Sequence, residues 1–156
     1  MQSEKKACSV LLEETITVIV QAMTEMKTLT RYERIGGEPT LERLVDSFYN
    51  RMDSLAEAKT IRAMHKPDLE QAKEDLKLFL AEWLGGPKLY TAGKGDLRLR
   101  TRHSHVAIGK AERDAWLLCM RQTMDELVAD AQIRREVYGL IEKLADLLRN
   151  TSADSQ

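Results

Sequence analysis

The stretch Leu41-Glu-Arg-Leu-Val-Asp-Ser-Phe-Tyr-Asn-Arg-Met-Asp-Ser-Leu55 has apolar residues at separations of three, one, three, one, three and three. In a helix of 3.6 residues per turn, this spacing aligns the apolar side chains along a single face. Phe48 and Tyr49 belong to that face and are expected to point inward. Just upstream, Ile35-Gly-Gly-Glu-Pro39 predicts a chain reversal, because glycine tolerates positive φ and proline suits the first turn of a helix.

Residues 8–29 also have helical spacing, with apolar positions three and four residues apart: Leu12, Ile16, Ile19, Met23 and Met26. Several β-branched neighbours weaken the intrinsic helix propensity of this segment. We therefore expect the helix to be supported by packing, either on the rest of the domain or on another subunit.

The later part of the chain has the same period. Pro67-Asp-Leu69 predicts the start of a helix that ends at Gly85-Gly86-Pro87, and its inward residues are Leu69, Ala72, Leu76, Phe79, Leu80 and Trp83. Residues 87–97 have no apolar period and predict a loop, followed by helices at about 98–105, 110–130 and 133–149. The sequence thus predicts an all-α fold in three parts: an N-terminal helical extension (1–30), one domain (31–150) and a flexible tail (151–156).

The composition narrows the function classes. Lys and Arg number 24 against 25 Asp and Glu, a net charge of -1, so no overall field favours nucleic acid or an acidic membrane surface. Cys8 and Cys119 form no CxxC or CxxCH motif, which argues against a structural zinc site or a thioredoxin-like centre. We find no signal-peptide pattern and no membrane span, and we expect a cytoplasmic protein.

The chemistry-bearing residues gather in Leu97-Arg-Leu-Arg-Thr-Arg-His103-Ser-His-Val-Ala-Ile-Gly109. His103 and His105 would point about 200° apart on a helix, so one ion cannot easily bind both. Arg98, Arg100 and Arg102 could meet carboxylates through their planar forks of donors, or could form a solvated basic face.

Three further residues carry polar groups that could serve a site. Tyr49 and Trp116 each combine an apolar body with one hydrogen-bond donor, although as isolated residues they are more often part of a core. His65, close to Pro67, could add a third polar group or lie at the surface.

Five blocks together resemble the group II truncated haemoglobins, over about residues 31–130. They are Tyr32-Glu-Arg-Ile-Gly-Gly-Glu38, Phe48-Tyr49, Phe79-Leu-Ala-Glu-Trp-Leu-Gly-Gly-Pro-Lys-Leu-Tyr90, Leu97-Arg-Leu-Arg-Thr-Arg-His103 and Glu112-Arg-Asp-Ala-Trp-Leu-Leu-Cys-Met120. The resemblance implies a two-over-two helical sandwich, here with an extra N-terminal helix and a C-terminal helix. It also implies a non-covalent haem b (iron protoporphyrin IX).

By this resemblance, His103 corresponds to the proximal iron ligand, and is the expected metal ligand. Tyr49, His65 and Trp116 correspond to distal polar positions, while Tyr90 corresponds to a tyrosine that touches haem. With the inward residues, the expected cofactor-binding set is His103, Tyr49, Phe48, His65, Ala72, Leu76, Leu80, Tyr90, Arg100, Arg102 and Trp116.

The sequence departs from the family pattern at three places. Gly93-Lys-Gly-Asp96 replaces the usual Gly-His-Pro, so we expect a more flexible loop that uses Lys94 at the haem edge. Asp75 replaces a basic residue; we expect it to turn outward or repel the propionates, leaving haem anchoring to the arginines. About 30 residues precede the matching region.

The expected function is reversible binding of dioxygen and related ligands such as NO and CO, with associated redox chemistry and an unidentified reductase. We expect a monomer or dimer. An Nδ1–H bond from His103 to the carbonyl of Leu99 would leave Nε2 for iron. His65 is expected to donate to the ligand rather than to coordinate iron, because Pro67 starts the distal helix two residues later. Two alternatives remain: a dedicated haem enzyme for NO or peroxide detoxification, and a haem-free helical interaction module.

Overall fold

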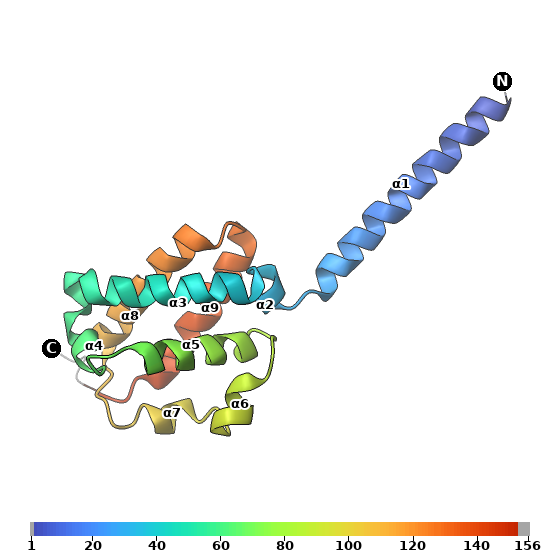
Figure 1. Cartoon of the computed structure of the whole chain (residues 1–156). Coiled ribbons are helices and arrows are strands. Elements are labelled where there is room, and N and C mark those ends of the chain that lie inside the picture. The colour runs from blue at the N-terminus through green and yellow to red at the C-terminus, as the bar shows by residue number, and fades with distance from the viewer. Residues whose placement is uncertain (1, 153–156) are drawn as a thin grey trace. The chain divides into compact units, whose positions relative to one another are not determined.

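The computed structural model describes residues 2–152 of the chain, and the side chains of residues 10–25 and 28–152. Helices alone form its regular structure over that range, which confirms the all-α prediction. In order they are α1 (Gln2–Thr28), α2 (Arg31–Arg34), α3 (Gly37–Ser54), the 3-10 turn η1 (Ala56–Ala58), α4 (Lys59–Ala63), α5 (Glu70–Trp83), α6 (Leu89–Lys94), α7 (Leu99–Arg102), α8 (Lys110–Leu127) and α9 (Ala131–Leu148) (Figure 1).

The chain divides into two units, with the boundary between Thr30 and Arg31. In the first unit, the large apolar side chains described in α1 are at least half exposed, from Val10 at 50% to Val18 at 67%. Met26, which the sequence places on the apolar face, has a side chain outside the described set, and residues 153–156 of the predicted tail are also outside the described residues. Among the described residues, no helix is both long enough and apolar enough to cross a membrane.

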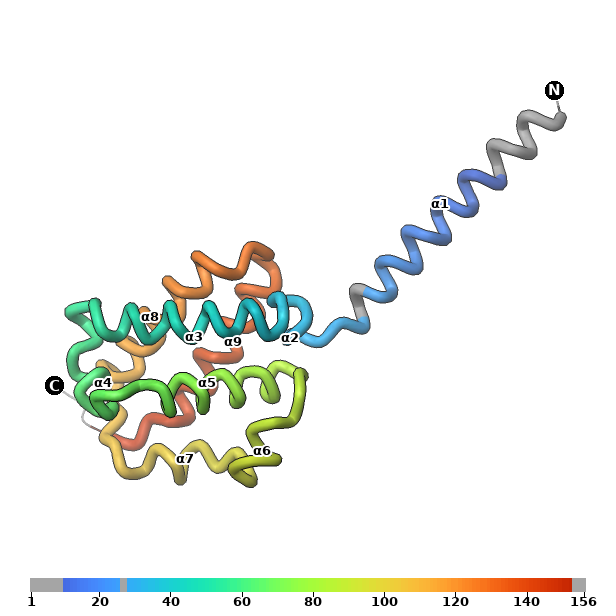
Figure 2. Tube along the Cα trace, viewed as in Figure 1, coloured from blue at the N-terminus to red at the C-terminus, as the bar shows by residue number. Residues whose placement is uncertain are grey.

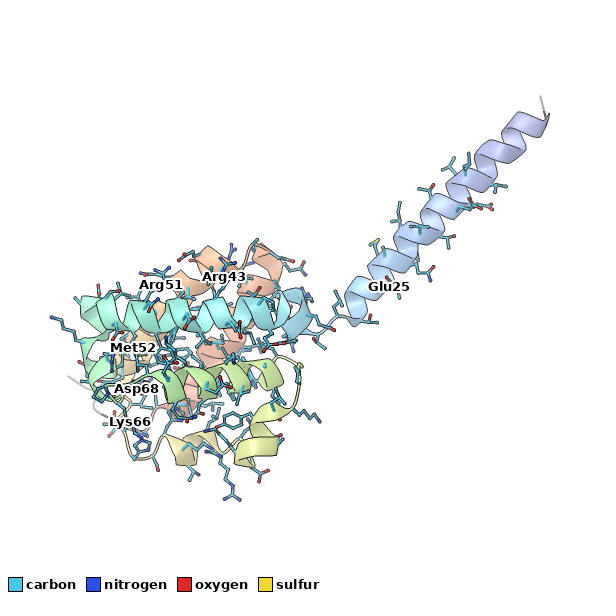
Figure 3. All side chains as sticks on the ribbon, in the orientation of Figure 1. Glu25, Arg43, Arg51, Met52, Lys66 and Asp68 are labelled. Atoms are coloured by element: carbon cyan, nitrogen blue, oxygen red, sulfur yellow. The ribbon has the colours of Figure 1, made fainter. Side chains whose placement is uncertain are left out.

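The second unit is organised around α3. Gly36 and Gly37 have φ values of 112° and 67°, a left-handed backbone that glycine adopts without strain, and this geometry turns the chain into α3. The predicted inward face is confirmed: Leu41, Leu44, Val45, Phe48, Tyr49 and Met52 are all buried. Met52, labelled in Figure 3, is 1% exposed.

Two helix pairs form the layers of this unit. α3 packs on α5 within one pair and α8 packs on α9 within the other, while α3 also packs extensively on α8 and joins the two pairs. The core lies between them and includes Leu41, Met120, Met124 and Ile133, all no more than 1% exposed. Burial of such side chains contributes roughly 1.5–3 kcal/mol each to folding.

The structure corrects three predicted boundaries. α5 begins at Glu70 instead of Pro67, because Pro67 and Asp68 belong to the turn before it, where the Asp68 carboxylate accepts the Glu70 N–H at 2.9 Å. The segment 87–97 is not simply a loop: it contains α6, which begins beside Glu82, whose carboxylate accepts hydrogen bonds from Thr91 N–H (2.9 Å) and Thr91 Oγ1 (2.7 Å). α7 ends at Arg102 instead of residue 105.

α6 and α7 are short segments along one edge of the unit, as Figure 2 shows in yellow-green and yellow. α6 packs on α5, and α7 packs on α9. The residues just after α9 meet this edge, where Asn150 contacts the segment between α7 and α8. α9 itself begins at Ala131 under a cap from Asp130, whose carboxylate accepts the N–H groups of Gln132 and Ile133.

Candidate functional site

Four aromatic side chains from three parts of the chain meet on the inner side of α3. The Phe48 ring centroid lies 5.0 Å from that of Tyr49 and 4.9 Å from that of Trp116 on α8. The Tyr49 ring meets the His65 ring edge-on at 5.8 Å. The structure therefore brings together three predicted distal residues, Tyr49, His65 and Trp116, around the fully buried Phe48.

The Tyr49 hydroxyl donates a hydrogen bond to the carbonyl oxygen of Ala72 on α5 at 3.3 Å. Burial raises the pKa of this hydroxyl far above its ordinary value, and the charge of Asp75 raises it further. Tyr49 therefore remains a neutral phenol and a hydrogen-bond donor throughout the physiological pH range. Among the described residues, the indole N–H of Trp116 has no hydrogen-bond partner, so it is free to donate.

His65 follows α4, next to the turn marked by Lys66 and Asp68 in Figure 3. Its Nδ1 lies 2.8 Å from the carbonyl oxygen of Ile61. A carbonyl can only accept, so Nδ1 carries the proton, and Nε2 of the neutral ring has a lone pair instead of a hydrogen. The donor role expected from the sequence thus requires the imidazolium form, whereas the neutral ring can accept a proton or coordinate iron.

His103 caps the C-terminal end of α7 and is half-buried. Its Nδ1 lies 2.7 Å from the carbonyl oxygen of Leu99, which is the hydrogen bond predicted from the sequence. The same reasoning places the proton on Nδ1 and leaves the Nε2 lone pair available to a metal. His105 lies beyond the end of α7, so the predicted helical angle between the two histidines does not apply to it, and its side chain is exposed.

α5 and α6 contribute a second group of predicted residues. Leu80 is buried, and Ala72 and Leu76, at four-residue intervals on the same face, pack against the core. The ring of Tyr90 on α6 meets the ring of Phe79 edge-on at 5.9 Å. Phe79 was predicted as an inward residue but not as a site residue, because periodicity alone does not distinguish a core position from a pocket wall.

The structure separates the predicted arginines. The Arg102 guanidinium lies 5.5 Å from the Tyr90 ring centroid and donates to the carbonyl oxygen of Lys94 at 2.6 Å. Arg98 is 72% exposed. Arg100 instead lines an open cavity of about 480 Å³ at the end of α9, and His105 lies on its wall as well.

Asp75 and Lys94 form an ion pair at 2.5 Å. The Asp75 side chain is 38% exposed and a cation from α6 neutralises its charge, while the expected repulsion of the propionates stays a prediction. The role of Lys94 at the haem edge also stays a prediction, and its ammonium would have to leave this carboxylate to fill that role. Sequence reasoning considered the two residues separately and had no signal that placed them together.

A two-layer helical domain with one imidazole held at the end of a short helix, and polar aromatic residues gathered on other helices, has the architecture of a truncated globin. A family model described as bacterial-like globin matches residues 30–150. The group 2 truncated hemoglobin YjbI of Bacillus subtilis is 36% identical over 126 residues, which cover 80% of this chain and 92% of the relative.

Two solved structures are similar over the same range. The group II 2-on-2 hemoglobin from the plant pathogen Agrobacterium tumefaciens has a TM-score of 0.77 and 42% identity, over 79% of this chain and 95% of that one. The cold-adapted truncated hemoglobin of the Antarctic marine bacterium Pseudoalteromonas haloplanktis TAC125 has a TM-score of 0.77 and 33% identity, over 79% of this chain and 99% of that one. The chain belongs to the bacterial-like globin family and, within it, to the group II truncated haemoglobins.

The residues present fit the haem cofactor that membership of this family implies. The hydrogen bond between His103 and Leu99 leaves one imidazole nitrogen for iron. The apolar and aromatic side chains of α3, α5 and α6 can line a flat hydrophobic ring, and the unpartnered indole N–H of Trp116 is suited to a small polar ligand.

Proposed function

We propose that this protein binds haem b and, through it, reversibly binds dioxygen and other small ligands such as NO and CO. The observation that carries the proposal is the 2.7 Å hydrogen bond from His103 Nδ1 to the Leu99 carbonyl, because it presents an unprotonated Nε2 in a fixed orientation. His103 is the proposed metal ligand. The proposed cofactor-binding residues are His103, Tyr49, Phe48, His65, Ala72, Leu76, Leu80, Tyr90, Arg100, Arg102 and Trp116.

Haem held by the neutral imidazole of His103 would supply an iron atom to which a diatomic ligand can bind. The chain's own residues determine how well such a ligand is held. Trp116 offers an indole N–H that has no hydrogen-bond acceptor among the described residues. Tyr49 offers a hydroxyl that must first leave the carbonyl of Ala72. Each donor is worth about 1–3 kcal/mol to a polarised ligand where water is excluded.

Apolar side chains accompany these two donors in the proposed site. Phe48 contacts both the Tyr49 and the Trp116 rings and is fully buried, whereas Trp116 is partly buried. Leu76 and Ala72 contribute an apolar and a small side chain from α5. The proposed setting is the cytoplasm, with a reductase that keeps the iron ferrous as the protein partner and the chain as a monomer or dimer.

The test is absorbance spectroscopy of the purified full chain in its ferric, ferrous and CO-bound forms. We expect a Soret band that shifts reversibly with CO. His103→Gly should lose the normal five-coordinate ferrous spectrum, and its matched control His105→Ala should keep it. Absence of a Soret band after haem addition would favour the haem-free interaction module, whereas loss of haem in His105→Ala alone would refute the ligand assignment.

A further inference from the structure

Asn150 stands two residues beyond the end of α9, and its side chain makes three hydrogen bonds to the loop between α7 and α8. Its Nδ2 donates to the carbonyl oxygens of His103 at 3.2 Å and Val106 at 2.9 Å. Its Oδ1 accepts the backbone N–H of Ile108 at 2.8 Å. The backbone N–H of Asn150 also donates to the Ile108 carbonyl at 2.9 Å, so a single residue at the end of the chain is bound to this loop four times.

The segment that carries His103 needs such support. α7 has four residues and no buried side chain, and an isolated helical turn is unstable in water. The Nδ1 bond to Leu99 fixes the imidazole relative to α7 but does not fix α7 relative to the domain. The position of the axial imidazole must therefore come from contacts with other elements.

The bonds of Asn150 supply that contact at the axial residue itself. The His103 carbonyl accepts one hydrogen bond from Val106 N–H at 3.2 Å, within the loop, and a second from Asn150, outside it. At the far end of the loop, Gly109 N–H donates to the Glu112 carboxylate at 2.9 Å, which anchors the loop to α8. Asn150 therefore connects the His103 end of the loop to α9.

We propose that Asn150 is a positioning residue that fixes the backbone of His103, and with it the axial imidazole, against the end of α9. The inference rests on the haem-binding function proposed above. The carboxamide suits this role because it combines one amino group, which serves two carbonyls, with one oxygen, which serves an N–H. An aspartate there would keep the acceptor but turn a second carboxylate oxygen toward two carbonyl oxygens.

The test compares Asn150→Ala and Asn150→Asp with the same two changes at Asn50, the chain's other asparagine, which is exposed on α3. The first readout is the iron–histidine stretching band in resonance Raman spectra of the ferrous protein. We expect this band to shift and broaden in both Asn150 variants and to stay unchanged in both Asn50 variants. A lower melting temperature with an unchanged band would overturn the inference, because it would indicate a structural role only.

The second readout is amide hydrogen exchange of the full chain as purified, whatever its haem content. We expect exchange at Ile108 to rise roughly tenfold in Asn150→Ala, the fold-change expected for one lost hydrogen bond. Because Asn150 is exposed, its replacement leaves no cavity, and Asn150→Ser, which keeps one hydroxyl, should have an intermediate effect. Absence of haem uptake would contradict the proposed function, whereas unchanged exchange at Ile108 would contradict the role of Asn150.

Discussion

Trp116→Phe should accelerate dioxygen release more than Tyr49→Phe does, although both changes remove one donor and keep an aromatic ring. The Trp116 N–H has no acceptor among the described residues, so a bound ligand gains its whole hydrogen bond. The Tyr49 hydroxyl already donates to the Ala72 carbonyl at 3.3 Å and must exchange that bond for the ligand. This distance is longer than the usual 2.7–2.8 Å for O–H···O, so the bond given up is weak but not worthless.

The magnitudes follow from this difference. A whole bond of about 1.4 kcal/mol corresponds to roughly a tenfold faster release for Trp116→Phe, if the bond is absent from the escape transition state. For Tyr49→Phe, a net of about 0.6 kcal/mol corresponds to roughly threefold. Independent effects would give about thirtyfold in the double variant, and a departure would measure coupling through Phe48, which contacts both rings.

The assay is stopped-flow replacement of dioxygen by CO. Trp83→Phe and Tyr138→Phe are matched controls, because they make the same chemical changes at rings that pair with Phe79 and Arg121, and they should release dioxygen at the native rate. Unchanged release in both single variants and in the double variant would refute the distal role. A larger effect of Tyr49→Phe than of Trp116→Phe would refute the exchange argument while leaving the distal role standing.

Three further predictions concern other parts of the chain. A chain of residues 31–156 should keep the haem spectrum but self-associate less than the full chain, because the exposed apolar side chains of α1 are removed. Absorbance measures the haem content and sedimentation measures the association, and loss of haem by a folded truncation would contradict this prediction. His65→Phe should leave a five-coordinate ferrous spectrum unchanged if His65 only contacts the ligand; a native six-coordinate spectrum that becomes five-coordinate, with faster ligand association, would instead identify His65 as an internal ligand. Burial raises the pKa of Tyr49, so the native state keeps a proton that the unfolded chain loses near pH 10. The free energy of unfolding should therefore fall above about pH 10, and it should fall less in Tyr49→Phe. Urea titrations measure it, and an equal fall with pH in both proteins would exclude this effect.

Local periodicity predicted those helices that bury a continuous apolar face. α3 illustrates this, since each inward residue from Leu41 to Met52 is buried. α6 illustrates the limit, because its start is tied to α5 through the Glu82 carboxylate and Thr91, and no apolar period marks it. The start of α5 shows a local limit, because Pro67 suits the first turn of a helix but the bond from Glu70 N–H to the Asp68 carboxylate belongs to a turn that delays the helix to Glu70.

Some contacts of the candidate site could likewise be predicted from the sequence and others could not. The Nδ1 bond of His103 could be predicted because its acceptor, Leu99, lies four residues away in the same helix. The ion pair between Asp75 and Lys94 could not, because the two residues come from different helices and the pairing depends on where α6 packs. Arg100 and Arg102 were grouped by sequence proximity, yet the structure places only Arg102 against Tyr90.

Contacts within one helix and contacts between distant segments have different consequences for His103, the proposed iron ligand. The segment Leu97–His103 contains both the imidazole and the carbonyl that orients it, so the ring's protonation state is set within a few residues. The position of that ring in the domain depends on contacts from other elements, and Asn150, which lies 47 residues away and outside the five motif blocks, supplies one of them. A chain could therefore keep the whole proximal motif and still present its histidine loosely, because a four-residue helix cannot hold itself in place. In this proposal the proximal motif supplies the iron ligand, and Asn150 beyond the end of α9 helps to hold it in place.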